Sequence, residues 1–163
     1  MKKFCTLILC LLALTVFPNN LLSATRTWTG GGAAGVWTDN NNWGGMPFPT
    51  TGDDAVFTAG AAVAINSAPA TLSLNSIQIT GRSVGFFVGA ACSLTLTGPG
   101  SFVNGAVNLD FQTPSTLTVA AGATLQFQGN AGFVANGNNV TINGAVTINP
   151  GSTLGYIWGA TTT

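Results

Sequence analysis

Ionisable side chains are scarce in this sequence. Its 163 residues include four basic residues, four acidic residues and no histidine. Two of the basic residues, Lys2 and Lys3, lie at the N-terminus, so the chain beyond residue 24 has no lysine, no glutamate and a net charge of −2. Such a surface offers no basic patch to nucleic acid and no cationic face to anionic lipid. High apolar content with little charge is also the reverse of a disordered composition.

The same shortage removes most catalytic arrangements. Without histidine, no His-based general base and no Ser-His-Asp triad can form. Asp110 and Arg82 are the remaining acid–base candidates, and we interpret them as a surface pair because two carboxylates flanking a cleft are not indicated. We therefore predict that the chain is not an enzyme and needs no cofactor.

Calcium binding has two candidate positions, Asp39 with Asn40–Asn42 and Asp53 with Asp54, because carboxylate and amide oxygens are calcium ligands. The nonapeptide calcium repeat and the EF-hand loop are both absent from the sequence. Aspartate and asparagine also form turns. The turn interpretation is the simpler one, so we predict no metal site.

The N-terminal segment has the layout of a secretory signal peptide. Lys2 and Lys3 precede an apolar stretch from Phe4 to Phe17, and Leu22-Ser23-Ala24 is a suitable cleavage site. The stretch is too short for a stable membrane span. We predict a signal peptide over residues 1–24 and a secreted, extracellular product of 25–163, which is long enough for one domain.

Intramolecular disulfides are not available to the processed chain. Cys5 and Cys10 would leave with the signal peptide, and only Cys92 would remain. Nothing near Cys92 in the sequence would lower its pKa, so we predict a small core residue and not a reactive thiol.

A repeat organises the rest of the chain. Leu94-Thr95-Leu96, Leu117-Thr118-Val119 and Val140-Thr141-Ile142 share one apolar-Thr-apolar pattern at a 23-residue interval, and Leu72-Ser73-Leu74 lies 22 residues earlier. A fixed period in this range indicates a stacked array in which each unit buries its apolar face against the next.

Each unit has more than one strand, because further alternating segments lie between the triplets: Ile77–Ile79, Val107–Phe111, Leu125–Phe127 and Val146–Ile148. Apolar residues at every second position indicate strands buried on one side. The predicted inward set is Leu72, Leu74, Ile77, Ile79, Leu94, Leu96, Val107, Leu109, Phe111, Leu117, Val119, Leu125, Phe127, Val140, Ile142, Val146 and Ile148.

Two all-β architectures fit these strands. A β-sandwich would explain the alternation and the Asn-Gly turns. It would not explain why like triplets return every 22 or 23 residues. A parallel β-helix does, because each coil places its strand above the matching strand of the coil before it. We therefore predict solenoid repeats over residues 61–163, with four to five coils rising about 20 Å.

Stacking of that kind would place Thr95, Thr118 and Thr141 in one outward column, with Ser73 beneath. Such a hydroxyl ladder could order water or ice, but the second column that an ice-binding face needs would consist of Thr97, Ala120 and Asn143, which is not uniform. The column is more simply explained by the strand preference of outward β-branched residues.

Residues 25–60 differ from the repeats, since Trp28, Trp37 and Trp43 lie there among glycine and asparagine. A solenoid needs a cap over its first coil, whose strand edges and core would otherwise be open. We predict that the three indoles are buried in such a cap. The alternative is that their rings are exposed and stack on sugars, which would make the chain a carbohydrate-binding module.

The block TWTGGGAAGVWTDNNNW, which begins at Thr27, resembles the Trp-Gly-rich opening of bacterial autotransporter-type β-helical passengers. The phrases LTLTGPGSF and LTVAAGATLQF are similar to autotransporter-associated β-strand repeats, and the resemblance covers roughly residues 27–155. Phe127-Gln128-Gly129-Asn130 and Phe133-Val134-Ala135-Asn136 also match the short FxxN element of chlamydial polymorphic outer-membrane passengers.

This resemblance implies a right-handed β-helix displayed outside the cell or on the bacterial outer-membrane surface, as an adhesin or structural scaffold. Its partner would be a receptor or glycan on a host or neighbouring cell. We expect a further coil to start at Leu154 and no C-terminal cap to follow it. We expect either the N-terminal part of a longer passenger or an open coil through which the protein self-associates.

Overall fold

The structure is a computed structural model that describes residues 23–87, 89–112, 114–136, 140–150, 152 and 157–158. Residues 1–22 of the predicted signal peptide and the coil start at Leu154 therefore lie outside the described residues. The strands are β1 Thr25–Thr27, β2 Asp54–Phe57, β3 Val63–Ile65, β4 Thr71–Leu74, β5 Ser76–Thr80, β6 Val84–Phe86, β7 Ser93–Leu96, β8 Ser101–Asn104, β9 Asn108–Gln112, β10 Thr116–Val119, β11 Thr124–Gln128, β12 Gly132–Asn136, β13 Val140–Ile142, β14 Ala145–Ile148 and β15 Ile157–Trp158.

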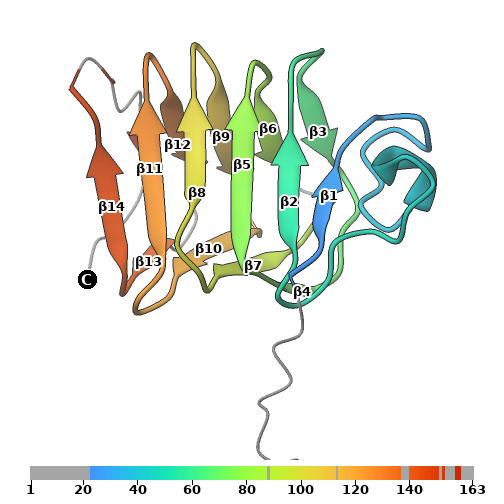
Figure 1. Cartoon of the computed structure of the whole chain (residues 1–163), viewed down its shortest axis with the longest axis horizontal. Helices are drawn as coiled ribbons and strands as arrows, with labels where there is room; N and C mark the ends of the chain where they lie inside the picture. Colours follow the sequence, from blue (N-terminus) through green and yellow to red (C-terminus); the bar gives the residue numbers. More distant parts are fainter. Residues whose placement is uncertain are drawn as a thin grey trace, which may run out of the picture.

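The described strands form three parallel sheets wrapped around one axis (Figure 1). The front sheet has the order β1-β2-β5-β8-β11-β14, the back sheet β15-β12-β9-β6-β3 and the base sheet β13-β10-β7-β4. Each coil gives one strand to each sheet, so β2 to β13 make about four coils. In Figure 1 the chain rises through the front sheet, descends at the back and advances from right to left, which is a right-handed winding. All strand pairs of the described residues are parallel, which excludes the β-sandwich.

Strand register confirms the repeat that the sequence predicts. In the base sheet, Leu72 pairs with Leu94, Leu94 with Leu117, and Leu117 with Val140. The 22- or 23-residue interval is thus the length of chain in one coil. Similar side chains lie above one another because a parallel ladder in register keeps each residue on the same face as its partner.

Each coil has three strands, and in the third coil the front-sheet strand does not follow the apolar-polar alternation. The segment Val107–Phe111 contributes to the back sheet, although it alternates like the front-sheet strands β5, β11 and β14. The front-sheet strand of that coil is β8, which places Ser101 in the core at 0% exposure and turns Phe102 outward. Ser101 is accommodated because its hydroxyl accepts a hydrogen bond from the backbone N of Ile77 at 3.1 Å. A polar inward residue reverses the alternation, so the pattern alone does not identify β8.

The predicted inward residues from Leu72 to Phe127 are all buried. At the last coil the prediction of burial is wrong: Val140 and Val146 are half-buried, while Ile142 and Ile148 are 54% and 45% exposed. These four residues keep the alternation, but β13 and β14 are edge strands of their sheets. A side chain in an edge strand is covered from one side by its neighbouring coil and from the other side by nothing in the described part of the chain.

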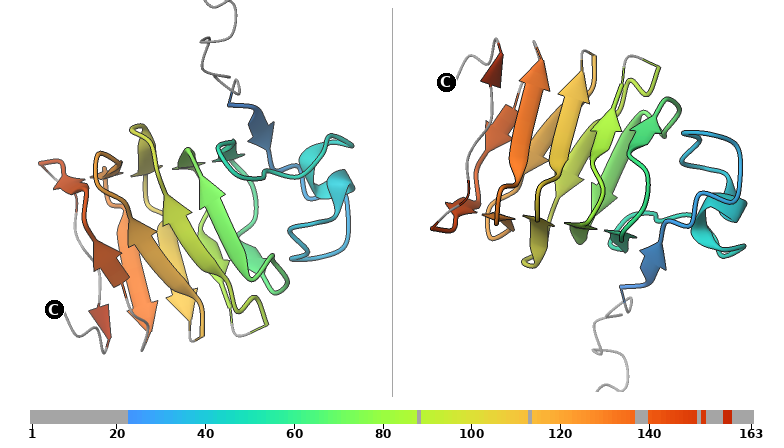
Figure 2. Two further views of the ribbon diagram at one scale, coloured as in Figure 1. Left: turned by 90° about the horizontal axis from the view of Figure 1, so that it is seen from below. Right: turned by 90° about the horizontal axis from the view of Figure 1, so that it is seen from above.

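The Trp/Gly-rich cap lies beyond the first coil, at one end of the stack (Figures 1 and 2). It begins with β1, which pairs with β2 and thereby covers the free edge of the front sheet. A 3-10 helix, Asn40–Trp43, follows, and the Asp39 carboxylate accepts a hydrogen bond from Asn41 N at its start. This turn is the one helical element in the described part of the chain, which therefore has no helix that could cross a bilayer.

Candidate functional site

The three cap tryptophans form one buried cluster. Trp28, Trp37 and Trp43 are 4%, 0% and 2% exposed. The Trp28 and Trp43 rings meet edge to face at 5.1 Å, as do Trp37 and Trp43 at 4.8 Å, and all three pack on Phe57 of the first coil. Stacking of a sugar on these indoles stays a prediction, and it needs ring faces that the packed cap covers.

Two of the three indole N–H groups have partners inside the protein. Trp37 Nε1 donates to Pro49 O at 3.1 Å, and Trp43 Nε1 donates to Trp37 O at 2.7 Å. Trp28 Nε1 donates to no atom of the described residues, yet it is not among the polar atoms sealed from solvent. Buried indole N–H groups usually find an acceptor. Of the three cap tryptophans, Trp28 is therefore the one whose indole N–H has unused hydrogen-bonding capacity.

Trp28 lines a cavity of about 410 Å³ between the cap and the first coil. We call it the cap cavity. Its walls are residues 28–30, 34–35 and 42 of the cap, residues 61–64 and 66 around β3, and Arg82 from the turn between β5 and β6. Half of these residues are alanine or glycine, so much of the space is left by their small size. The size falls within the range of small-molecule sites.

The side of β3 that faces away from β6 opens on this cavity. Val63 N donates to Ser83 O, and Ile65 O accepts from Phe87 N, so residues 63 and 65 direct their backbone groups at β6. Because consecutive residues of a strand alternate, the N–H and C=O of Ala64 point the other way. Within the described residues these two groups have no hydrogen-bond partner, and β3 is the edge strand of the back sheet.

Arg82 is held in the cavity wall by backbone carbonyls. Its Nε donates to Thr58 O, and its Nη2 donates to Ala59 O at 2.7 Å. Gly60 permits this arrangement, because a Cβ at that position would collide with the guanidinium. No carboxylate of the described residues forms an ion pair with Arg82, and none lines the cap cavity. The guanidinium charge is thus oriented but not compensated.

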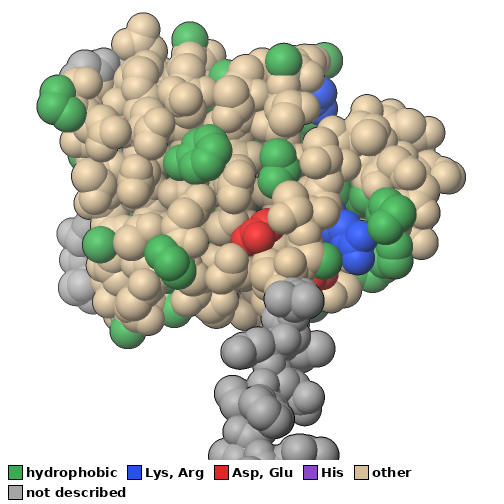
Figure 3. All heavy atoms as spheres, viewed as in Figure 1, with side chains coloured by type: hydrophobic (Ala, Val, Ile, Leu, Met, Phe, Trp, Pro, Cys, Tyr) green, Lys and Arg blue, Asp and Glu red, His purple; other side chains and the backbone are tan. Residues whose placement is uncertain are grey.

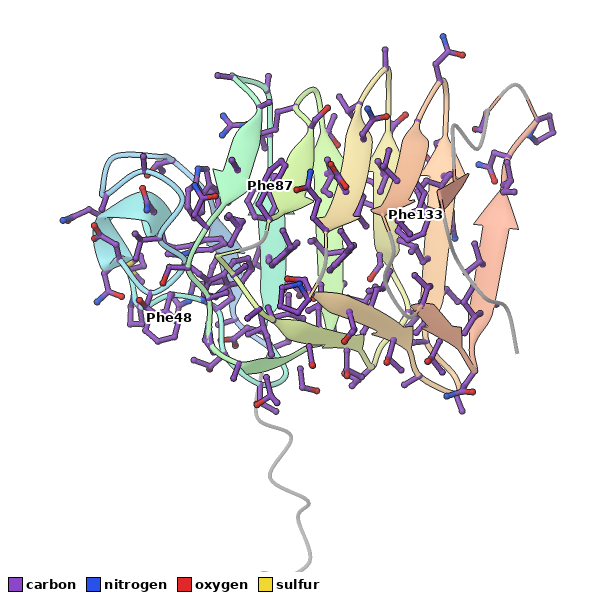
Figure 4. The ribbon with its side chains drawn as sticks, turned by 180° about the vertical axis from the view of Figure 1, so that it is seen from behind. Phe48, Phe87 and Phe133 are labelled. Atoms are coloured by element: carbon purple, nitrogen blue, oxygen red, sulfur yellow. The ribbon has the colours of Figure 1, made fainter. Side chains whose placement is uncertain are left out.

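Asp110, the predicted companion of Arg82, lies elsewhere. It lines an adjoining cavity of about 160 Å³ on the back sheet with Phe87 and Gly85, and this cavity shares residues 62–64 with the cap cavity. Figure 4 shows Phe87 near the cap end of that sheet, well before Phe133. Burial raises the pKa of Asp110, and its Oδ1 has no hydrogen-bond partner. The structure does not bring the proposed acid–base pair together, because Arg82 is engaged by Thr58 and Ala59 instead.

The carboxylates considered for calcium serve as structural ties. Asp39 accepts hydrogen bonds from Ala33 N at 2.7 Å and Asn41 N at 3.0 Å, and these bonds lower its pKa. Asp53 accepts from the backbone N and hydroxyl of Thr50, at 2.9 and 3.1 Å. No group of three or more metal-ligating side chains occurs among the described residues.

Asp54 connects the first coil to the second. Its carboxylate accepts hydrogen bonds from Ser76 Oγ at 2.6 Å, Asn75 Nδ2 at 2.7 Å and Ser23 Oγ at 2.9 Å. Burial alone would raise the pKa of Asp54, but these bonds outweigh it and lower the pKa.

The predicted hydroxyl column is present. Ser73, Thr95, Thr118 and Thr141 are in register on the outer face of the base sheet. The second column does not form a matching row of hydroxyls, because Thr97 is followed there by Ala120 and Asn143 in the next coils. The Thr97 hydroxyl itself donates to Leu74 O at 2.9 Å. Hydrophobic side chains are scattered over the front face, where uncharged polar groups and backbone predominate (Figure 3).

Cys92 is a core residue, as predicted. It is 0% exposed, and burial raises the pKa of its thiol to about 11. A protonated, enclosed thiol has neither the charge nor the access that reactive cysteines need.

Comparisons of the chain with protein-family models, with curated proteins and with solved structures gave no match. The fold is that of a parallel β-solenoid with an N-terminal cap. The candidate site is therefore described from the residues that line the cap cavity alone.

Proposed function

We propose that this protein is a non-catalytic β-helix module that is secreted or displayed at the cell surface, where it works as a structural or adhesin-type element. The observation that carries the proposal is the in-register stack of about four coils, with apolar columns inside and uncharged polar columns outside. A parallel stack of this kind makes a stiff, elongated surface from few residues per coil.

The sequence supports the external location. Lys2 and Lys3 followed by Phe4–Phe17 have the layout of an export signal, and the Trp-Gly-rich block and repeats resemble those of autotransporter passengers. The partner that fits this class is a receptor or glycan on another cell. A surface with few charges would meet it through hydroxyl and amide groups and not through long-range electrostatic attraction.

Export is tested by expressing the whole chain in a bacterium and locating it by protease treatment of intact cells and by mass spectrometry. We expect cleavage near Ala24 and an exposed product. The matched control is Leu12→Arg, which interrupts the apolar stretch and should keep the chain uncleaved inside the cell. An uncleaved wild-type chain inside the cell would refute the external location.

Adhesion is tested with beads coated with the processed protein and applied to candidate cells. The folded protein should retain beads on cells, whereas the Leu117→Asp variant, in which the stack is disrupted, should not. Equal retention by the folded and disrupted proteins would argue against an adhesin function, because the stack would then contribute nothing to binding.

A further inference from the structure

The cap cavity has features that a structural cap does not require. It is lined by an indole N–H without a partner, by a fixed guanidinium without a counter-ion and by an open strand edge. Two neighbouring tryptophans in the same cluster have their N–H groups satisfied. The third, that of Trp28, lies in the cavity lining and is not sealed from solvent, so it is free to donate to a ligand.

We propose that the cap cavity binds a small ligand through a carboxylate, which accepts hydrogen bonds from Arg82 and from the indole N–H of Trp28. Both residues line the same cavity. Arg82 keeps Nη1 available, because its bonds to Thr58 O and Ala59 O involve Nε and Nη2. The amide Nδ2 of Asn66, in the same wall, donates to no atom of the described residues and is a third donor.

Charge selects an anion over a cation or a neutral group. The lining contains one formal charge, that of Arg82. Asp110 lines the adjoining cavity, and the carboxylates of Asp39 and Asp54 accept hydrogen bonds outside the lining. A partly enclosed charge interacts more strongly than one in bulk water. Bonds to a guanidinium are also roughly twice as strong as those between neutral groups. The planar fork of arginine matches a carboxylate.

The remainder of the ligand is polar and small. The N–H and C=O of Ala64 on the open edge of β3 offer one donor and one acceptor, which suits the hydroxyls of a sugar or the amide of a peptide. The one aromatic residue in the lining, Trp28, is 4% exposed, so its ring offers little face for stacking. A volume of about 410 Å³ accommodates a monosaccharide or a dipeptide. The carboxylate is the chemistry common to an acidic sugar and to a peptide C-terminus.

Isothermal titration calorimetry on the whole processed protein tests the proposal with two matched pairs of probes. D-glucuronate is compared with D-glucose, and N-acetyl-Ala-Ala with its C-terminal amide. We expect saturable binding of at least one carboxylate, with its neutral counterpart weaker by at least about tenfold, and weaker binding at high salt. Binding of glucuronate alone would assign an acidic sugar, and binding of the peptide alone would assign a chain terminus.

Substitutions place the binding in the cap cavity. Arg82→Gln should weaken the carboxylate by at least about tenfold, and Trp28→Phe, which keeps an aromatic ring and removes the N–H, by about fivefold. Arg26→Gln is the matched control, because Arg26 is on β1 and does not line the cavity. It should leave the affinity unchanged. Melting temperatures identify any variant that fails to fold.

Three results would overturn the proposal: no binding of either carboxylate to the wild-type protein, equal binding of the neutral counterparts, or equal loss in Arg82→Gln and Arg26→Gln. The first two need no variant, so misfolding of Arg82→Gln would not remove the test. The outcome is also separate from the export and adhesion experiments, because the cavity is formed by the cap and the first two coils.

Discussion

The ring of Phe86 stacks on the ring of Phe111 in the next coil, with 4.9 Å between centroids and 5° between planes. The two residues are paired in register in the back sheet. Trp37 of the cap continues the row at 5.9 Å from Phe86. The aromatic side chains thus join the cap to the coils through the core, and neighbouring coils stabilise one another by burying the same columns of side chains.

A charge in an inward column should disrupt the stack. Leu117 is 1% exposed and lies between Leu94 and Val140 of adjacent coils. Leu117→Asp should lower the free energy of unfolding by several kcal/mol, because a carboxylate is buried there without a partner. Thermal unfolding followed by circular dichroism measures the loss. The control is Thr118→Asp, one residue along and facing outward, which should change the melting temperature little. Similar losses in both variants would mean that the inward and outward assignments are wrong.

Asn42 should be the polar residue on which the cap depends most. Its side chain accepts from Gly32 N at 2.9 Å and donates to Ala33 O at 2.7 Å and Val36 O at 2.9 Å, and it is 1% exposed. Asn42→Ala leaves Gly32 N without an acceptor and removes one of the two bonds to each of the Ala33 and Val36 carbonyls, which keep their bonds from Val36 N and Asp39 N. It should cost about 2–4 kcal/mol of unfolding free energy.

The neighbouring residue provides the control for that measurement. Asn41 is exposed, and Asn41→Ala should cost under about 1 kcal/mol in chemical denaturation. A cap that tolerates both substitutions equally would not be held by the Asn42 side chain.

Asp110 should make the protein less stable as the pH rises. Burial raises its pKa in the folded protein above the value in the unfolded chain. The folded state therefore binds the proton more tightly, and stability is lost as the pH rises through the folded pKa. Asp110→Asn should be more stable than the wild type at neutral pH, and the difference should vanish below the unfolded pKa of about 3.9. The melting temperatures of both proteins, measured from neutral pH to below a pH of about 3.9, test this prediction. A variant that is less stable than the wild type at neutral pH would contradict it.

Asp54 should have the opposite effect. Burial opposes its ionisation, but hydrogen bonds from Ser76, Asn75 and Ser23 outweigh burial and lower its pKa. Its contribution to stability is present above the unfolded pKa and lost as the pH falls through the folded one. Asp54→Asn should therefore be less stable than the wild type at neutral pH, with a gap that narrows in acid. A gap independent of pH would mean that the charge of Asp54 contributes nothing. Signal-peptide cleavage after Ala24 would remove Ser23 and leave the other two bonds.

Cys92 should resist thiol reagents as long as the coils are folded. It is 0% exposed, and burial raises the pKa of its thiol to about 11. Iodoacetamide at neutral pH should label the peptide that contains Cys92 in denaturant and leave it unmodified in buffer, as measured by mass spectrometry. Rapid labelling of the folded protein would show that the second coil opens locally.

The coil period and the inward columns could be predicted because they depend on local rules. Leu94, Leu117 and Val140 recur at one spacing, and alternation within each triplet decides which face is apolar. The strand β8 could not be predicted in this way, since Ser101 occupies an inward position and depends on Ile77 of the preceding coil for its hydrogen bond. The exposure of Ile142 and Ile148 was missed for a related reason: alternation gives the direction of a side chain, whereas burial depends on what packs above it.

The candidate site was predicted in part. Trp28 was identified, but for its ring face, and Arg82 was identified as a companion of Asp110. The sequence contains no sign that Trp28 Nε1 would lack an acceptor while Trp37 and Trp43 find theirs. Two glycines are needed for the cavity wall, but their role could not be predicted from the sequence. Gly60 lies against the Arg82 guanidinium, and Gly35 lies against Ala64 O.

By itself the sequence determined the all-β class, the length of a coil, the direction of most core side chains and the presence of a cap, because periodicity and turn residues act over a few positions. The tertiary structure alone decided which strands share a sheet and where the stack leaves apolar residues exposed. It also placed Trp28, Ala64 and Arg82 around one cavity. These residues come from separate segments, and their proximity results from how the cap loop, the first coil and the second coil pack together.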